Sequence, residues 1–314
     1  MQEVHINKNP NDYGNEIDLR ELFYVLLAGK WIIVSVTAFV AIVGVIYSLL
    51  LPNIYESKAL LAPVNSSSNI SGALRGYSGL AGLAGISLPS GSDEDNSVKA
   101  IEKINSLSFF KSHIMTNIYL PDLMAVSSWD SETNIIAFDE NIYDTNTNNW
   151  IREYSYPKQQ IPSAQESFKE FKKKLRINKD TKSSFITISI KHQSPHIAKQ
   201  WAELVVNEVN SFYRQKDKLE SERAVKYLNE QISITNLSEI KQVLAELLQE
   251  ETKKLTLIEA NQSYVFDYID PPAVMELKSE PKRSLICLLS ILLGGMLSIL
   301  LVLIKHYAFS KKAS

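Results

Sequence analysis

Two uncharged, apolar stretches decide the fold: WIIVSVTAFVAIVGVIYSLLLPNIY at residues 31–55 and SLICLLSILLGGMLSILLVLI at residues 284–304. A helix of about 20 apolar residues crosses the roughly 30 Å hydrocarbon layer of a membrane. Because an ionised side chain is costly at that depth, the absence of charge is as informative as the leucine content. The sequence therefore predicts two transmembrane helices, at residues 31–51 and 284–304, with one large domain at residues 52–283 between them.

The charges around the spans predict their orientation. Basic residues lie on the terminal side of both spans: Arg20, Lys30, Lys305, Lys311 and Lys312. By the positive-inside rule, residues 1–30 and 305–314 are then cytoplasmic tails, and residues 52–283 lie on the other side of the membrane. Three basic residues between positions 278 and 283 act against this orientation without reversing it.

Composition narrows the class of protein further. The net charge of −2 argues against a nucleic-acid-binding protein, which usually carries a basic excess. Cys287 is the one cysteine and lies inside the second span, so an intrachain disulfide is excluded. The domain between the spans must therefore be stable through burial of apolar side chains.

Local sequence patterns predict both helices and strands. Residues 16–30 have apolar side chains at helical spacing, which indicates either a juxtamembrane helix or an extension of the first span. Strands are expected at 55–63 and 185–190, and helices at 96–119 and 163–175. The second of these helices begins with Ser163 and Glu166 in the spacing of a capping box. Residues 127–162 are rich in polar residues and are expected to form a surface excursion.

Residues 196–270 contain neither glycine nor proline and have helical apolar stripes. One unbroken helix over 195–262 would be about 100 Å long. The 21 residues from Tyr264 to Leu285 reach at most about 70 Å, too short to return to the membrane. We therefore expect a helical projection at about 195–262, formed by a rising arm near 195–232 and a descending arm near 237–262, with a helix cap at Thr235 or Asn236. The fold class is α+β, a base domain with a projecting long-helix hairpin, flanked by two transmembrane helices.

A glycine-rich segment follows the first strand. Six of the 11 glycines fall within residues 72–91, and Leu fills some of the gaps. The backbone there is conformationally permissive, which predicts a loop. Its apolar residues suggest contact with a neighbouring subunit or the membrane surface, and a plain linker is the alternative. The residues concerned are Gly76, Gly79, Gly82, Gly85, Leu80 and Leu83.

Motifs that would indicate an enzyme are lacking. The sequence has no phosphate-binding loop and no nucleophile elbow. His192 and His196 are four residues apart, as zinc ligands on a helix can be, but Pro195 between them disrupts that geometry. We expect no catalytic residues, no metal site and no cofactor.

The last part of the chain carries a motif that suggests helix packing. A linker at residues 270–283 contains Pro271, Pro272 and Pro281, and the second span contains Gly294, Gly295 and Ser298. Gly294 and Ser298 have the spacing of small residues that lets helices approach closely in lipid. Alternatively, the span is a plain anchor and its glycines are incidental.

In their order and spacing, these segments resemble the Wzz-type polysaccharide chain-length determinants, also called polysaccharide co-polymerases. The matching segments are IDLRELFYVLLAGKWIIV, YESKALLAP, SSFITISIKHQSPHIAKQWAELVVNEVN, the helical return up to YVFDYIDPP, and EPKRSLICLLSILLGGMLS. Pro281 is the one proline between Pro272 and the second span, so the linker is less proline-rich than in many members of the family.

The resemblance implies a non-catalytic protein of the bacterial inner membrane with a periplasmic domain and both termini in the cytoplasm. It implies a closed homo-oligomeric ring, with eight subunits expected. It also implies partnership with a Wzy-type polymerase and lipid-linked polysaccharide, and control of chain length in O-antigen-type lipopolysaccharide biosynthesis. The resemblance also implies linker and packing roles for Pro271, Pro272, Pro281, Gly294 and Gly295.

Two other functions remain open from the residues. The chain could be the membrane adaptor of a capsule or exopolysaccharide exporter that works with a separate tyrosine kinase, because the tail KHYAFSKKAS is too short to form a kinase domain. A two-span sensor would need a cytoplasmic output module, and none is expected in either tail.

Overall fold

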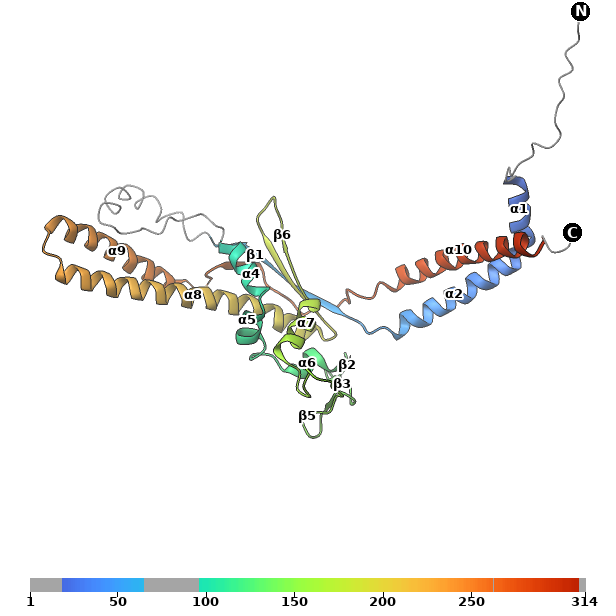
Figure 1. Cartoon of the computed structure of the whole chain (residues 1–314), viewed down its shortest axis with the longest axis horizontal. Helices are drawn as coiled ribbons and strands as arrows, with labels where there is room; N and C mark the ends of the chain where they lie inside the picture. Colours follow the sequence, from blue (N-terminus) through green and yellow to red (C-terminus); the bar gives the residue numbers. More distant parts are fainter. Residues whose placement is uncertain (1–18, 65–95, 262, 311–314) are drawn as a thin grey trace, which may run out of the picture. The chain divides into compact units, whose positions relative to one another are not determined.

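The computed structural model describes residues 19–64, 96–261 and 263–310. The chain divides into two compact units (Figure 1). Unit 1 comprises Met1–Pro52 and Glu280–Ser314, and unit 2 comprises Asn53–Ser279.

The described residues of unit 1 form three helices, and two of them are long and apolar enough to cross a membrane. These are α2 (Lys30–Leu50) and α10 (Arg283–Ser310), of which residues Arg283–Tyr307 meet the length and composition of a span. The shorter helix α1 (Leu19–Ala28) ends at Gly29, immediately before α2 begins. It is therefore a helix separate from α2.

Unit 2 is built on a four-stranded sheet in the order β6-β7-β1-β8, and all its neighbouring strands are antiparallel. The strands are β1 (Tyr55–Pro63), β6 (Leu175–Lys179), β7 (Ile186–His192) and β8 (Phe266–Asp270). In β7, Ile186, Ile188 and Ile190 are fully buried, because alternate side chains of a strand point to the same face. Strands β1 and β7 were predicted, whereas β6 was not: it begins at Leu175, the last residue of the helix expected at 163–175.

Helix α8 (Pro195–Ile234) packs its first turns against this sheet and forms the core of unit 2. Trp201, Val205 and Val209 are buried on one face, as their helical spacing predicted. Ser194 caps the helix by accepting a hydrogen bond from the backbone N–H of Ile197. Pro195 occupies the first turn, where its missing N–H has no partner to lose.

Helices α8 and α9 (Ser238–Ala260) form a hairpin that extends beyond the sheet (Figure 1). Lys218 of α8 pairs with Glu259 of α9, and Tyr264 donates a 2.6 Å hydrogen bond to Asp217 of α8. The predicted α+β fold with a long-helix hairpin and two flanking apolar helices is thus confirmed. The predicted cap was wrong: Leu237 precedes α9 without a side-chain cap, and the Thr235 hydroxyl donates backwards to the Gln231 carbonyl.

Residues 96–119 do not form the single helix that their apolar spacing predicted. They contain α4 (Asn96–Ile104), a short α5 (Leu107–Phe109) and a π-helical turn, η1 (Phe110–Ile114). Ser106 interrupts the helix because its hydroxyl accepts a hydrogen bond from the Phe109 N–H and so caps a new turn.

The polar excursion at residues 127–162 contains two small hairpins that sequence reasoning missed. After α6 (Leu120–Met124), β2 (Val126–Trp129) pairs with β3 (Ile136–Phe138), and β4 (Tyr143–Asp144) pairs with β5 (Asn149–Trp150). Helix α7 (Ala164–Lys174) follows and begins with the predicted capping box of Ser163 and Glu166.

Candidate functional site: the contact between helices α2 and α10

The contact between α2 and α10 in unit 1 is lined by glycine and small polar residues. At two positions a glycine of one helix lies close to the other helix: Gly44 against Ser290, and Gly294 against Val40 and the backbone of Thr37. Gly29, which immediately precedes α2, lies against Val302 of α10. Without Cβ atoms the backbones can approach closely and gain van der Waals contact, which is the main attraction between helices in lipid.

Gly44 marks the closest approach. A Cβ atom placed there would lie 2.1 Å from Ser290 Oγ and 2.5 Å from Ser290 Cβ, distances that no real Cβ adopts. Gly294 is only slightly less confined, with Val40 Cβ at 3.0 Å and Thr37 Cα at 3.2 Å from such an atom. A side chain at Gly44 or Gly294 would therefore push the two helices apart.

Gly295 has a different environment from its neighbour. A Cβ atom there would meet no atom within 4 Å. Residues on this side of α10, such as Leu292 and Met296, are more than half exposed. Within unit 1, Gly295 therefore lies on a face of α10 that α2 does not cover.

Hydroxyl groups of Thr37, Ser290 and Ser298 also lie along the contact. Ser298 is fully buried, lies 3.4 Å from Thr37 (Oγ to Oγ1), and donates a 2.7 Å hydrogen bond to the Gly295 carbonyl. Ser290 donates to the Ile286 carbonyl at 2.9 Å. Because lipid offers no hydrogen-bond partner, polar groups of a span must be satisfied within the protein, as these are.

Near one end of the contact, Arg283 Nε donates to the Ser48 carbonyl at 3.2 Å. This bond ties the first turn of α10 to the last turn of α2.

Sequence reasoning picked out Gly294 and Ser298 but missed Gly44, Ser48 and Ser290. A signal for them was present, because Gly44 and Ser48 are four residues apart and Ser290, Gly294 and Ser298 repeat at the same spacing. That repeat places all three residues on one face of α10.

The linker before α10 runs beside the start of β1 within unit 2. Ser57 donates a 2.8 Å hydrogen bond to the Ala273 carbonyl, and the Ser279 N–H donates to the Ile54 carbonyl at 2.8 Å. Pro272 is buried, whereas Pro271 is exposed and Pro281 is partly exposed. The segments that lead into and out of unit 2 are therefore held together. The glycine-rich loop with Gly76, Gly79, Gly82, Gly85, Leu80 and Leu83 lies outside the described residues.

Two titratable residues of unit 2 with shifted pKa values, His192 and Asp122, lie close together. Its Nδ1 accepts a 2.9 Å hydrogen bond from the Ser194 N–H, so Nε2 carries the proton and donates to the Asp122 carbonyl at 2.9 Å. Burial, with the nearby Lys174 charge, lowers the pKa of His192 to about 4. Burial also raises the pKa of the Asp122 carboxyl to about 6.

His192 therefore acts as a neutral structural group that links β7, α6 and the start of α8. Among the described residues, no group of three or more His, Cys, Asp or Glu side chains is arranged to hold a metal ion.

The comparisons with known proteins point to one family. Residues 15–116 match the family model described as "Wzz: Chain length determinant protein". No curated protein matches the sequence.

Two solved structures are similar to this chain. A "full-length bacterial polysaccharide co-polymerase" is 14% identical, with 95% of this chain and 100% of that chain covered and a TM-score of 0.42. A fragment of WzzB, a polysaccharide co-polymerase from Salmonella Typhimurium, is 15% identical, with 73% and 100% covered and a TM-score of 0.28. The family match confirms that this chain resembles the Wzz chain length determinant proteins over residues 15–116, a range that includes the first apolar helix and strand β1.

Proposed function

We propose that this protein regulates the chain length of a surface polysaccharide of O-antigen type without catalysing its synthesis. The observation that carries the proposal is the match of residues 15–116 to the chain length determinant family. Two apolar helices that flank an α+β unit support it, because a protein of this design can act on lipid-linked polymers at a membrane.

The proposed arrangement is a homo-oligomeric ring, expected to be an octamer, in the bacterial inner membrane. Both tails lie in the cytoplasm, and residues 52–283 lie in the periplasm. The ring works with a Wzy-type polymerase and biases the number of repeat units that the polymerase adds to a lipid-linked chain.

The two faces of α10 suggest how a span could serve this role. The face with Gly294 and Ser298 packs on α2, so it is occupied within one subunit. The face with Gly295 is not covered by α2 and presents apolar side chains such as Met296, which is 69% exposed. We assign this second face to contact with the polymerase or a neighbouring subunit. Pro271, Pro272 and Pro281 shape the linker that leads to it.

The test is the polysaccharide ladder on a gel, together with total polymer, from cells with and without the gene. Loss of a preferred length, with polymer still made at scattered lengths, is the expected result. Complete loss of polymer would instead support the adaptor of an export system that works with a separate kinase. An unchanged ladder would contradict both functions.

A further inference from the structure

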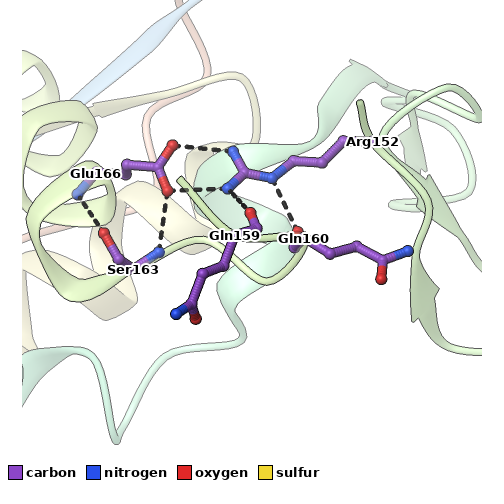
Figure 2. Close-up of polar contacts among 5 residues, drawn as sticks. All are labelled: Arg152, Gln159, Gln160, Ser163 and Glu166. Atoms are coloured by element: carbon purple, nitrogen blue, oxygen red, sulfur yellow. Dashed lines mark hydrogen bonds and ion pairs between the residues drawn. The ribbon is translucent and has the colours of Figure 1, made fainter. Parts of the chain in front are cut away.

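The loop at residues 152–163, here called the Tyr154 loop, joins β5 to α7 and is closed at its base by one arginine. Figure 2 shows the Arg152 guanidinium directed at both oxygens of the Glu166 carboxylate and at two backbone carbonyls. The distances are 3.1 Å from Nη1 to Oε1 and 2.9 Å from Nη2 to Oε2. The carbonyls are those of Gln159, 2.5 Å from Nη2, and Gln160, 2.9 Å from Nε.

This arrangement fixes the loop to the two elements that flank it. Glu166 also accepts a hydrogen bond from the Ser163 N–H as part of the capping box of α7. The Arg152 hydrogen bonds hold the pKa of the Glu166 carboxyl below its usual range, so the carboxylate stays charged. Gln160 Nε2 donates to the Trp150 carbonyl at 2.6 Å and ties the loop to β5. Bidentate, charge-assisted bonds of this kind impose a specific geometry.

The same loop exposes large side chains to solvent. The exposed fraction is 96% for Tyr156, 59% for Tyr154 and 62% for Ile161. The Lys158 N–H donates to the Ser155 carbonyl at 2.9 Å, which closes a turn with Tyr156 inside it. Figure 2 shows the side chain of Gln159 pointing away from the guanidinium, so its amide is directed out of the closed base.

A cluster of aromatic side chains, Tyr119, Tyr143 and Trp150, packs β4 and β5 and so supports the loop that follows β5. Tyr143 is buried, and its ring packs edge-on against Trp150 with centroids 5.1 Å apart. Its hydroxyl lies 2.6 Å from that of Tyr119, which joins the hairpin to the start of α6. The loop is thus presented by a packed support.

A loop ordered in advance loses little conformational entropy when it binds. Tyrosine rings supply large, rigid contact area with a hydroxyl at one end, and neighbouring amides supply adaptable hydrogen bonds. The loop tip carries one acidic residue, Glu153, and one basic residue, Lys158, so it favours neither anionic nor cationic partners. A polysaccharide is complementary to this surface. The apolar C–H faces of its sugar rings can stack on tyrosine rings, and its hydroxyl groups can bond to side-chain amides.

We infer that the Tyr154 loop is a contact surface for polysaccharide, on which Tyr154 and Tyr156 stack against sugar rings and Gln159 bonds their hydroxyls. This inference rests on the proposed function and adds to it a place on unit 2 where the growing polymer is held. Arg152 and Glu166 act as positioning residues that keep the loop in its binding conformation.

The test uses the full chain in detergent micelles. The probe is the polysaccharide released by mild acid from cells that carry the gene, labelled at its reducing end with a fluorophore. Binding is read as fluorescence anisotropy, and native mass is measured on the same samples. The test variant is Tyr154→Ala/Tyr156→Ala, whose side chains are exposed enough for the fold to tolerate their loss. Tyr156→Phe keeps the ring, and Tyr227→Ala removes a 60% exposed tyrosine on α8 as the matched control.

We expect the double variant to bind at least about tenfold more weakly, with Tyr156→Phe and Tyr227→Ala close to wild type. Arg152→Lys keeps the charge but loses the bidentate geometry, and we expect it to weaken binding while circular dichroism stays unchanged. Equal binding by the double variant and wild type would overturn the inference, as would a wild-type chain that does not bind the probe. A lower native mass of the double variant would also overturn it and assign the loop to contact with a second copy of the chain.

The ladder of the deletion strain separates this inference from the proposed function. A scattered ladder after deletion, combined with unaltered binding by the double variant, would overturn only the role of the loop. An unchanged ladder after deletion would overturn the proposed function itself.

Discussion

Asn210 of α8 satisfies three backbone groups at the start of β8 with a single side chain. Its Oδ1 accepts hydrogen bonds from the N–H groups of Val265 and Phe266, and its Nδ2 donates to the Phe266 carbonyl, each at 2.9 Å. Val265 and Phe266 are buried, so these groups have little access to water. Asn210 therefore links strand β8 to helix α8.

We predict that Asn210→Ala lowers the free energy of unfolding by about 2–3 kcal/mol, because buried backbone groups would lose their partners. The measurement is urea unfolding of the full chain in mild detergent, followed by tryptophan fluorescence. Asn207→Ala, at an exposed position three residues earlier on the same helix, is the control and should change stability by less than about 0.5 kcal/mol. Similar losses in both variants would show that Asn210 has no special role.

His192 and Asp122 respond to pH in opposite directions. With its pKa lowered to about 4, native His192 stays neutral where the unfolded chain takes up a proton, so its contribution to stability falls as pH drops from about 6.5 to 4. With its pKa raised to about 6, native Asp122 takes up a proton before the unfolded chain does. Its contribution therefore rises as pH drops from about 6 to 4. The two effects oppose each other over this range.

We predict that Asp122→Asn removes the compensating effect. Relative to wild type, the variant should lose about 1–2 kcal/mol of stability between pH 6 and pH 4, a value discounted because the carboxyl is only partly buried. The backbone carbonyl that accepts the His192 bond stays in place in this variant. The measurement is urea unfolding at a series of pH values. A difference between variant and wild type that does not change with pH would contradict this account.

At the scale of elements, three hairpins share one turn design. Asp130, Asp144 and Asp180 each accept a hydrogen bond from the backbone N–H two residues later and from a hydroxyl three residues later. The residue after each hydroxyl adopts a positive φ: 54° at Asn134, 54° at Asn148 and 60° at Ser184. Asn tolerates this conformation better than Ser does.

Ser184→Gly should therefore stabilise the β6–β7 hairpin by about 0.5–1 kcal/mol, because glycine adopts a positive φ without steric cost. Ser183→Gly is the matched comparison, and it should destabilise the protein because it removes the hydroxyl that donates to Asp180. Thermal unfolding of both variants checks the prediction. If Ser184→Gly lowers the midpoint as much as Ser183→Gly does, strain at position 184 is not significant.

Some of these elements could be predicted from the sequence and others could not. Strand β7 and helix α7 were predicted because alternation and a capping box are local signals. The hairpins at residues 126–150 were missed, since strands of two to four residues are too short to show a period. The repeated Asp-x-x-Ser/Thr turns followed by Asn or Ser would have indicated them. The spacing of Gly294 and Ser298 indicated helix packing on that face, but the sequence did not show that α2 is the partner or that it leaves Gly295 uncovered.

The contact between α2 and α10 can be tested by cross-linking. Thr37 and Ser298 place their oxygens 3.4 Å apart, so Thr37→Cys/Ser298→Cys in a Cys287→Ser background should form a disulfide on mild oxidation. Val34→Cys/Ser298→Cys, with Val34 59% exposed, is the control that should not. Protease cleavage between the spans followed by a gel shows whether the fragments stay joined.

Glycine variants in that cysteine background test the packing directly. Gly44→Val should reduce the cross-link several-fold, because its side chain would occupy the place of Ser290. Gly295→Val should leave it unchanged, because a Cβ atom at that position would meet no atom of α2 within 4 Å. Equal cross-linking by the two variants would contradict the described helix contact.

At the scale of the whole molecule, the chain joins a membrane-type helix pair to an α+β unit with a long helical hairpin. Its match to the chain length determinant family covers the first apolar helix and the first strand of the sheet. The proposal is that this design regulates a polymerase, and that the two faces of α10 have separate tasks. Under this proposal, Gly295→Val changes polymer length while the α2–α10 cross-link persists.

The most direct measurement of the central claim is the polysaccharide ladder of a deletion strain in which the full chain is expressed at graded levels. The level of the polymerase is held constant and checked by immunoblot. The account predicts that a preferred length returns as expression rises, while total polymer stays within about twofold. Polymer that appears only when the chain is expressed, or a ladder that is the same at every level, would contradict it.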